Sequence, residues 1–365
     1  MATSNLYVHV PFCASKCRYC AFYSAPAPSR ADVADFLRLL PRELELRGLA
    51  DARPDTVYVG GGTPSLPGPD GLRALLAALP RPAPGAEVSV ELNPADVSPA
   101  LAAALREGGV TRASVGAQSF DPDTLARLGR RHGPLEIRAA ARALRAAGIP
   151  RLSLDLIAAV PGEAPGALAR SLREAVALGP DHVSVYPLSV EPGTPLARDG
   201  VAPPSDEEAL AAVAEAESFL ASGGYARYEL SNYARPGAEC RHNLAVWRGE
   251  DYAGVGPAAC SRVGFVRRAN APDFAAWRAA LEAGRLPPAR LETLSAADDE
   301  AERFATRVRL ARWRGPDPAT PAGPRRAAAL AALRRAGLVR PLGGGDWTLT
   351  ARGREVADSV MAELV

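Results

Sequence analysis

Short apolar runs alternate with longer segments of helical period along the first half of the chain. The runs predict buried strands over Leu6–Val10, Thr56–Val59, Glu87–Glu91, Ala113–Val115, Leu152–Ile157 and His182–Tyr186. Helices are predicted between them over Ala31–Leu46, Gly71–Leu79, Pro99–Glu107, Pro134–Ala147 and Gly166–Leu178. This alternation predicts an α/β fold with parallel strands, either an open doubly wound sheet or a barrel. Six units are too few for a full eight-unit barrel, so a partial (β/α)6 barrel is expected.

The pattern changes after about Leu196, where the second half of the chain begins. A helix over Ser205–Leu220 is predicted from the capping box formed by Ser205 and Glu208. Residues 225–270 show little helical period. The later elements are predicted as helices over Asp298–Arg312, Arg325–Ala336 and Ala351–Leu364, with a strand pair around Gly343–Gly345. We therefore expect a barrel core over 1–196, a flanking segment over 197–290 and a small winged-helix-like domain over 291–365.

Composition narrows the class of protein. Hydrophobic residues make up 47% of the 365 positions and the formal net charge is +2, which exclude global disorder. A nearly neutral chain favours neither nucleic acid nor an anionic membrane as partner. No apolar stretch reaches the roughly 18 residues of a membrane span, and the N-terminus lacks a signal-peptide core. We expect a cytoplasmic protein, for which transient membrane association stays open.

The winged-helix-like tail raises an alternative, a DNA- or RNA-binding protein. Its first helix carries Arg325, Arg326, Arg334 and Arg335. Arginine is equally dense elsewhere in this chain, so a packing or lid domain is the simpler interpretation.

The strongest chemical signal is a cysteine triplet directly after the first predicted strand. Cys13, Cys17 and Cys20 are spaced so that three thiolates could hold three corners of a [4Fe–4S] cluster and leave one iron open. A zinc site with His9 or a distant cysteine as fourth ligand is an alternative, although no second pair of closely spaced cysteines follows. A redox pair of Cys17 and Cys20 is another, which leaves Cys13 unexplained.

The triplet, with Tyr19 before its last cysteine, resembles the signature of radical S-adenosylmethionine (SAM) enzymes. Together with the preceding His9-Val-Pro-Phe, it is similar to the oxygen-independent coproporphyrinogen oxidase family, which includes a heme-chaperone branch. The resemblance implies a radical SAM barrel and a [4Fe–4S] cluster held by Cys13, Cys17 and Cys20. It also implies that the open iron binds SAM, which reductive cleavage converts to methionine and a 5′-deoxyadenosyl radical.

Polar residues at the predicted strand ends are candidates for the SAM pocket. A glycine run, Gly60–Gly62, follows the second strand and allows close backbone approach. Asp155 lies in an apolar run, where a carboxylate needs a partner, and a structural salt bridge is the alternative to a role in the pocket. By resemblance, the family's cofactor pocket matches Tyr7, Gly62, Thr63, Glu91, Gln118, Arg130 and Asp155. The chain departs from the family at Ala158-Ala159-Val160, where Tyr-Gly-Leu is usual.

A second candidate site is His242, in the stretch Arg241-His-Asn-Leu-Ala-Val-Trp247. Imidazole is a good axial heme ligand and tryptophan can pack on a porphyrin, although a histidine in a loop is more often structural. The resemblance favours heme binding, because heme chaperones carry a His-Asn-x3-Trp motif. Val246 stands where tyrosine is usual, and Cys260 stands where histidine is usual. We expect Cys240 and Cys260 to be small buried residues.

Two observations separate the branches of the family. The oxidase has a fourth cysteine two residues after the third, where this chain has Phe22. The oxidase also has a long extension before its cluster motif, which we expect to be absent here. The resemblance therefore implies a heme chaperone that binds the cluster, SAM and heme and delivers heme to an apo-hemoprotein. The alternative is radical decarboxylation of coproporphyrinogen propionates.

Overall fold

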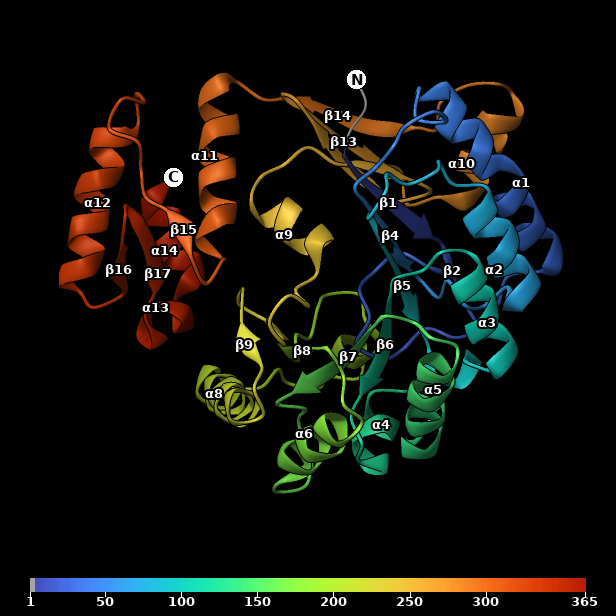
Figure 1. The fold of residues 1–365 in the computed structure, drawn as a ribbon, viewed down its shortest axis with the longest axis horizontal. Helices are drawn as coiled ribbons and strands as arrows, with labels where there is room; N and C mark the ends of the chain where they lie inside the picture. Colours follow the sequence, from blue (N-terminus) through green and yellow to red (C-terminus); the bar gives the residue numbers. More distant parts are fainter. Residues whose placement is uncertain (1–3) are drawn as a thin grey trace.

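The largest element of the computed structural model, which describes residues 4–365, is a nine-stranded sheet (Figure 1). Its parallel central strands are β1 (Asn5–Val10), β4 (Thr56–Gly61), β5 (Glu87–Leu92), β6 (Arg112–Gln118), β7 (Arg151–Ala158) and β8 (His182–Pro187). They lie side by side in chain order. A doubly wound sheet reverses its order at a switch point. The unbroken order therefore decides for the partial barrel, and the six strand predictions are confirmed.

Helices cover the outer face of this sheet (Figure 1). They are α1 (Arg30–Leu46), α2 (Gly68–Ala77), α3 (Pro99–Glu107), α4 (Pro122–Arg127), α5 (Pro134–Ala146) and α6 (Ala167–Ala177). Five were predicted, and α4 was missed because its six residues are too short to show a period. The outward-facing residues of the strands pack under these helices, as Val59 and Leu154 illustrate at 0% exposure. The residues that alternate with them, such as Tyr58, Ser153 and Asp155, face the inside of the barrel.

Residues from the flanking segment complete both edges of the sheet. Strand β11 (Ala253–Val255) pairs parallel with β1. At the opposite edge, β10 (Asn232–Ala234) and β9 (Ala226–Arg227) add antiparallel to β8. The other elements of this half are α7 (Pro195–Arg198), α8 (Asp206–Ser222), α9 (Arg241–Trp247), β12 (Cys260–Val263), β13 (Val266–Asn270), α10 (Phe274–Glu282) and β14 (Ala289–Thr293). The predicted capping box of α8 is confirmed.

The short elements of the first half position loops. Strands β2 (Phe12–Cys13) and β3 (Ala25–Pro26) pair with each other at the base of the cysteine loop. The single turn η1 (Pro94–Asp96) follows β5. No helix within residues 4–365 is long and apolar enough to cross a membrane.

The C-terminal part forms a module with its own hydrophobic core. It consists of α11 (Ala296–Val308), β15 (Trp313–Arg314), α12 (Gly323–Arg335), β16 (Val339–Gly343), β17 (Asp346–Leu349), α13 (Ala351–Glu355) and α14 (Ala357–Leu364). The three strands form one antiparallel sheet. The expected order of a helix, a hairpin and a helical end is confirmed.

Two helix predictions need correction here. The helix predicted over Asp298–Arg312 ends at Val308, because the following residues pair instead with the barrel, where Leu310 bridges Glu229. The single helix predicted over Ala351–Leu364 is broken at Val356, whose φ is −121° and ψ is 35°. The break lets α13 approach the backbone of Leu338 while α14 buries its own apolar side in the module core.

Candidate functional site

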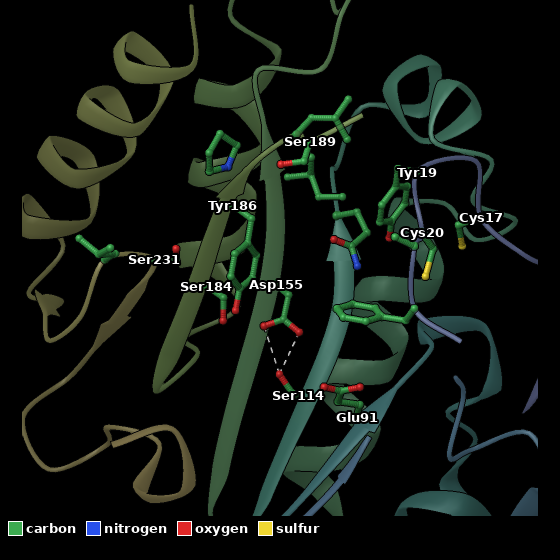
Figure 2. Close-up of a pocket in the computed structure, with 18 of the residues that line it drawn as sticks. Cys17, Tyr19, Cys20, Glu91, Ser114, Asp155, Ser184, Tyr186, Ser189 and Ser231 are labelled. Carbon is green, nitrogen blue, oxygen red and sulfur yellow. Dashed lines mark hydrogen bonds between the residues drawn. The ribbon is translucent and has the colours of Figure 1, made fainter. Parts of the chain in front are cut away.

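A cavity of about 1340 Å³ opens at the carboxyl ends of the barrel strands and extends to the C-terminal module. Figure 2 shows part of its lining, with the cysteine loop on one side and β7 and β8 on the other. Nine of the predicted site residues line it: Cys13, Cys17, Cys20, Gly62, Thr63, Glu91, Gln118, Arg130 and Asp155. Tyr7 and His242 lie behind the wall. Residues from five parallel strands, or from the segments that follow them, thus meet in one space, as expected for a parallel barrel.

The three cysteines lie on the loop between β1 and α1 and are half-buried and free of disulfides. Two of them receive hydrogen bonds from the opposite wall. Thr63 Oγ1 donates to Cys13 Sγ at 3.5 Å, and Arg130 Nη1 donates to Cys17 Sγ at 3.3 Å. Burial raises the pKa of Cys20, but coordination to a metal would deprotonate the thiol.

The glycine run is packed tightly on this loop. The Gly62 and Thr63 amides donate to the carbonyls of Val10 and Phe12, each at 2.7 Å. A Cβ at position 62 would lie 2.3 Å from the Phe12 oxygen. Gly62 is therefore required by the chain's own packing, which fixes Thr63 beside Cys13.

Glu91 lies near the end of β5 and faces the cavity, and no cationic side chain within residues 4–365 pairs with it. Its carboxylate accepts from the Tyr58 hydroxyl at 2.8 Å and from the Gly61 amide at 3.2 Å. Burial is the main cause that raises the pKa of Glu91 to about 7. A Cβ on Gly60 would approach the Glu91 carboxylate to 2.8 Å, so the glycine run also makes room for this side chain. Sequence reasoning missed Tyr58, because a tyrosine inside an apolar strand resembles a core residue.

Gln118 and Arg130 form the wall at the end of β6. Gln118 has a φ of +64°, which is rare for a residue other than glycine, and it follows an irregularity in the pairing of β6 with β7. Strain of this kind often marks functional sites. Arg130 Nη2 donates to the Gly116 carbonyl at 2.8 Å, whereas its buried Nε has no acceptor among the described residues.

Asp155 on β7 is held by serines, not by the salt bridge that was the structural alternative. Figure 2 shows its carboxylate facing Ser114, whose hydroxyl lies 2.9 and 3.1 Å from the two oxygens. The Ser153 hydroxyl is 3.5 Å from the nearer one. Burial raises the pKa of Asp155. The serines offset the cost of burial and leave the carboxylate beside the cavity.

Tyr7 and His242 both pack on Tyr58, which separates them from the cavity. The ring centroids lie 6.3 Å apart for Tyr7 and 5.2 Å apart for His242. His242 is 5% exposed, and burial lowers its pKa to about 4. Axial ligation of a heme in the cavity by His242 therefore requires a rearrangement of α9, and this role stays a prediction.

The hydrogen bonds of His242 define which of its nitrogens is free. Thr56 Oγ1 donates to Asn5 Oδ1 at 2.8 Å, so it accepts from His242 Nδ1 at 2.8 Å. Nδ1 then carries the proton and Nε2 keeps the lone pair. A neutral imidazole with a fixed tautomer has the protonation state of a metal ligand.

Trp247 and Cys260 differ from expectation. Trp247 packs on the core of the C-terminal module, with the Arg309 guanidinium 4.3 Å above its ring. Cys260 is exposed, so the expectation of a buried residue is wrong, whereas Cys240 is buried. Cys240 is part of the cavity lining, whereas Cys260 is outside it.

One of the two candidates for a fourth zinc ligand is already engaged. Both ring nitrogens of His9 are engaged, Nδ1 with the Tyr7 hydroxyl at 3.0 Å and Nε2 with the Tyr23 carbonyl at 2.9 Å. Within residues 4–365, no three His, Cys, Asp or Glu side chains converge on one metal ion. A cubane cluster offers each thiolate a different iron, so it does not require the sulfurs to meet at one point.

Comparison with known proteins gives the family. Residues 7–175 match the model of the radical SAM superfamily. The heme chaperone HemW of Mycobacterium tuberculosis (strain CDC 1551 / Oshkosh) is 39% identical over 373 aligned positions, covering 99% of this chain and 94% of the relative. The chain belongs to the HemW family of radical SAM proteins. Membership in the superfamily implies SAM and a [4Fe–4S] cluster as cofactors.

Two further similarities agree with this family. HemW of Escherichia coli (strain K12) is 37% identical over 270 aligned positions, which cover 72% of this chain and 70% of the relative. The solved structure of coproporphyrinogen III oxidase (HemN) from E. coli, described as a radical SAM enzyme, superposes with a TM-score of 0.83. It covers 100% of this chain and 90% of that one at 24% identity, which shows a shared fold.

Proposed function

We propose that Cys13, Cys17 and Cys20 bind a [4Fe–4S] cluster and that SAM occupies the adjacent part of the cavity. The observation that supports this proposal is the lining itself, because all three thiols share one cavity with the SAM residues expected from the sequence. Those residues are Gly62, Thr63, Glu91, Gln118, Arg130 and Asp155, with Tyr7 acting through Tyr58. When bound, the cluster would deliver an electron to SAM and so provide radical chemistry.

The side chains around this space suit a charged nucleotide. Arg130 Nε is a buried donor that a carboxylate of the cofactor would satisfy. Glu91 and Asp155 offer carboxylate oxygens that would accept from hydroxyl groups. The cysteine loop and the glycine run close one side and limit the access of water. The reduced cysteines that a cluster needs fit a cytoplasmic location.

We further propose that the protein is a heme chaperone, which binds heme and delivers it to an apo-hemoprotein. The observation that supports this proposal is the near full-length similarity to a protein named heme chaperone HemW. The cavity supports it in size, since typical ligand pockets span about 300–1,000 Å³ and this one exceeds that range. A second ligand could therefore share the cavity with SAM.

The alternative is oxidative decarboxylation of coproporphyrinogen, which the shared fold of HemN would allow. Phe22 argues against it, because the oxidase branch has a cysteine there. The Phe22 side chain lines the cavity mouth and is 71% exposed.

One sample tests these proposals together. Anaerobically reconstituted protein should contain about four irons and four sulfides per chain, should bind heme stoichiometrically and should transfer it to an apo-hemoprotein. Zinc in place of iron and sulfide would overturn the cluster. Conversion of coproporphyrinogen in the presence of SAM and a reductant would support the oxidase function instead of the chaperone function. A salt-dependent mobility shift with DNA would support the nucleic-acid alternative.

A further inference from the structure

Three arginines line the end of the cavity that is remote from the cysteines. Arg227 lies on β9, Arg354 on α13, and Arg309 follows α11. Glu217 of α8 lines the same end. Four elements that are distant in the chain thus bring charged side chains to one place, where the barrel meets the C-terminal module.

The arginines outnumber the acceptors that they contact. Arg354 Nη2 binds both oxygens of Glu217, at 2.9 and 3.1 Å. Arg227 Nε is 3.6 Å from the same carboxylate, too far for a hydrogen bond. This nitrogen is buried without an acceptor among the described residues, although 10% of the side chain is exposed. Two guanidinium groups therefore share one carboxylate.

Neighbouring donors are also unsatisfied. Arg309 contacts Glu229 only at 3.7 Å, and its buried Nε has no acceptor in the described chain. The buried Tyr233 hydroxyl likewise lacks a partner there. Burial, with the nearby Glu217 as the next cause, raises the pKa of Tyr233 to about 12, so its hydroxyl remains a donor at neutral pH. Buried donors without acceptors are costly. An anionic ligand in the cavity would satisfy the nitrogens of Arg227 and Arg309, whose side chains line it, whereas Tyr233 lies outside the lining.

The remaining lining at this end is mixed. Asp206, Glu355 and Asp358 also line it, but none is within salt-bridge distance of the three arginines. Leu210, Val213 and Ala214 of α8, together with Leu230, provide an apolar wall. An apolar wall beside a cluster of arginines fits a flat apolar ring that carries carboxylates at its edge.

We propose that Arg227, Arg309 and Arg354 bind the carboxylates of a dicarboxylic tetrapyrrole, with its ring against the apolar side of α8. This inference rests on the proposed heme-chaperone function and adds the orientation of its ligand. Carboxylates are anchored at the arginine end, and the ring extends toward the SAM end. Glu217 occupies the arginines when the ligand is absent and competes with it.

A purely structural role would be that Glu217 and Arg354 only tie α13 to α8. The two readings predict opposite effects for Glu217→Gln. If Glu217 competes with the ligand, its neutralisation frees two guanidinium groups and tightens heme binding. If it only ties the module to the barrel, its loss weakens binding or leaves it unchanged.

The experiment is a heme titration of the anaerobic holoprotein with two ligands, heme and heme dimethyl ester. Arg227→Gln and Arg354→Gln should each weaken heme binding about tenfold or more, the size expected for one charge-assisted hydrogen bond. The ester lacks the charged carboxylates, so the same variants should bind it as the wild type does. Arg352→Gln is the matched control, since Arg352 is an exposed arginine on α13 outside the cavity lining. Thermal unfolding of each variant reports whether the fold is retained.

The outcomes separate this inference from the function on which it rests. If the wild type binds no heme, the chaperone function fails. If it binds heme and its ester equally, and the arginine variants bind as the wild type does, only the arginine site is overturned. Weaker binding of both ligands by Glu217→Gln and Arg354→Gln, with lower melting temperatures, would mean that the arginines and Glu217 have only a structural role. Tighter heme binding by Glu217→Gln with weaker binding by both arginine variants supports the site.

Discussion

The two ends of the cavity are built in different ways. At the cysteine end, one eight-residue stretch supplies the three sulfur atoms, and backbone contacts with Phe12 fix the opposing Thr63. At the arginine end, side chains from α8, β9 and α13 converge across more than a hundred residues of sequence. The first end groups three thiols, for which we propose a metal cluster, whereas the second groups arginines of which two have a buried nitrogen without an acceptor among the described residues. If both proposals hold, one cavity combines a site for metal chemistry with a site for an anion.

Removing a cysteine tests whether the two ends are separable and should give the largest effect. Cys13→Ala or Cys17→Ala should abolish cluster assembly, because two thiolates cannot hold the cubane. Iron and sulfide analysis after anaerobic reconstitution measures this loss. Cys260→Ala is the control, because Cys260 is exposed and outside the cavity lining. Heme affinity should be measured in the same variants. If Cys17→Ala loses as much heme affinity as Arg354→Gln does, the two ends form a single site.

The difference between the ends also explains what the sequence could predict. The barrel strands and the cysteine triplet are local signals, namely apolar runs and a fixed spacing, so the sequence was sufficient for both. The arginine end depends on which strand β9 joins and where α13 packs, and no local pattern carries that information. The sequence placed His242 in a candidate site, but only the tertiary structure shows Tyr58 between it and the cavity.

The carboxylates at the two ends have different partners. Glu217 contacts Arg354, whereas Glu91 accepts hydrogen bonds from the neutral Tyr58 hydroxyl and Gly61 amide, and burial raises the pKa of Glu91 from 4.5 to about 7. A pKa that is higher in the folded state means that stability is lost as pH rises from about 4.5 through 7. The free energy of unfolding should fall by roughly 3 kcal/mol over this range, and Glu91→Gln should remove most of that fall.

Denaturant unfolding at pH 5 and pH 8 measures this effect. Glu250→Gln is the control, since Glu250 is exposed and should retain the wild-type profile. An equal pH dependence in wild type and Glu91→Gln would show that Glu91 is ionised at no cost in the folded protein.

Behind the cavity wall, Thr56 fixes the tautomer of His242, and replacing it tests whether the histidine reaches heme at all. Thr56→Val removes the acceptor of the Nδ1 proton, so the imidazole loses its fixed orientation. If Nε2 binds heme iron, heme affinity should fall about tenfold, as for other hydrogen-bond partners of metal ligands. The Soret spectrum should also change.

Arg241→Gln, an exposed neighbour on α9, is the control. An unaltered spectrum in both Thr56→Val and His242→Ala would exclude axial ligation by this histidine.

The smallest expected effect concerns Ala159, which follows β7 on the barrel rim where the family usually has glycine. Its φ of +55° lies in the left-handed region, which costs an alanine about 1–2 kcal/mol. Glycine avoids that cost but loses more backbone entropy on folding. Ala159→Gly should therefore stabilise the protein by roughly 0.5–1 kcal/mol in chemical denaturation, while Ala158→Gly, inside the strand, should destabilise it. The strained turn belongs to neither the cysteine end nor the arginine end of the cavity. Heme affinity and the iron and sulfide content should therefore stay unchanged. A change in cluster content would mean that the conformation of this turn, and not only the side chains at the cysteine end, sets the geometry of the metal site.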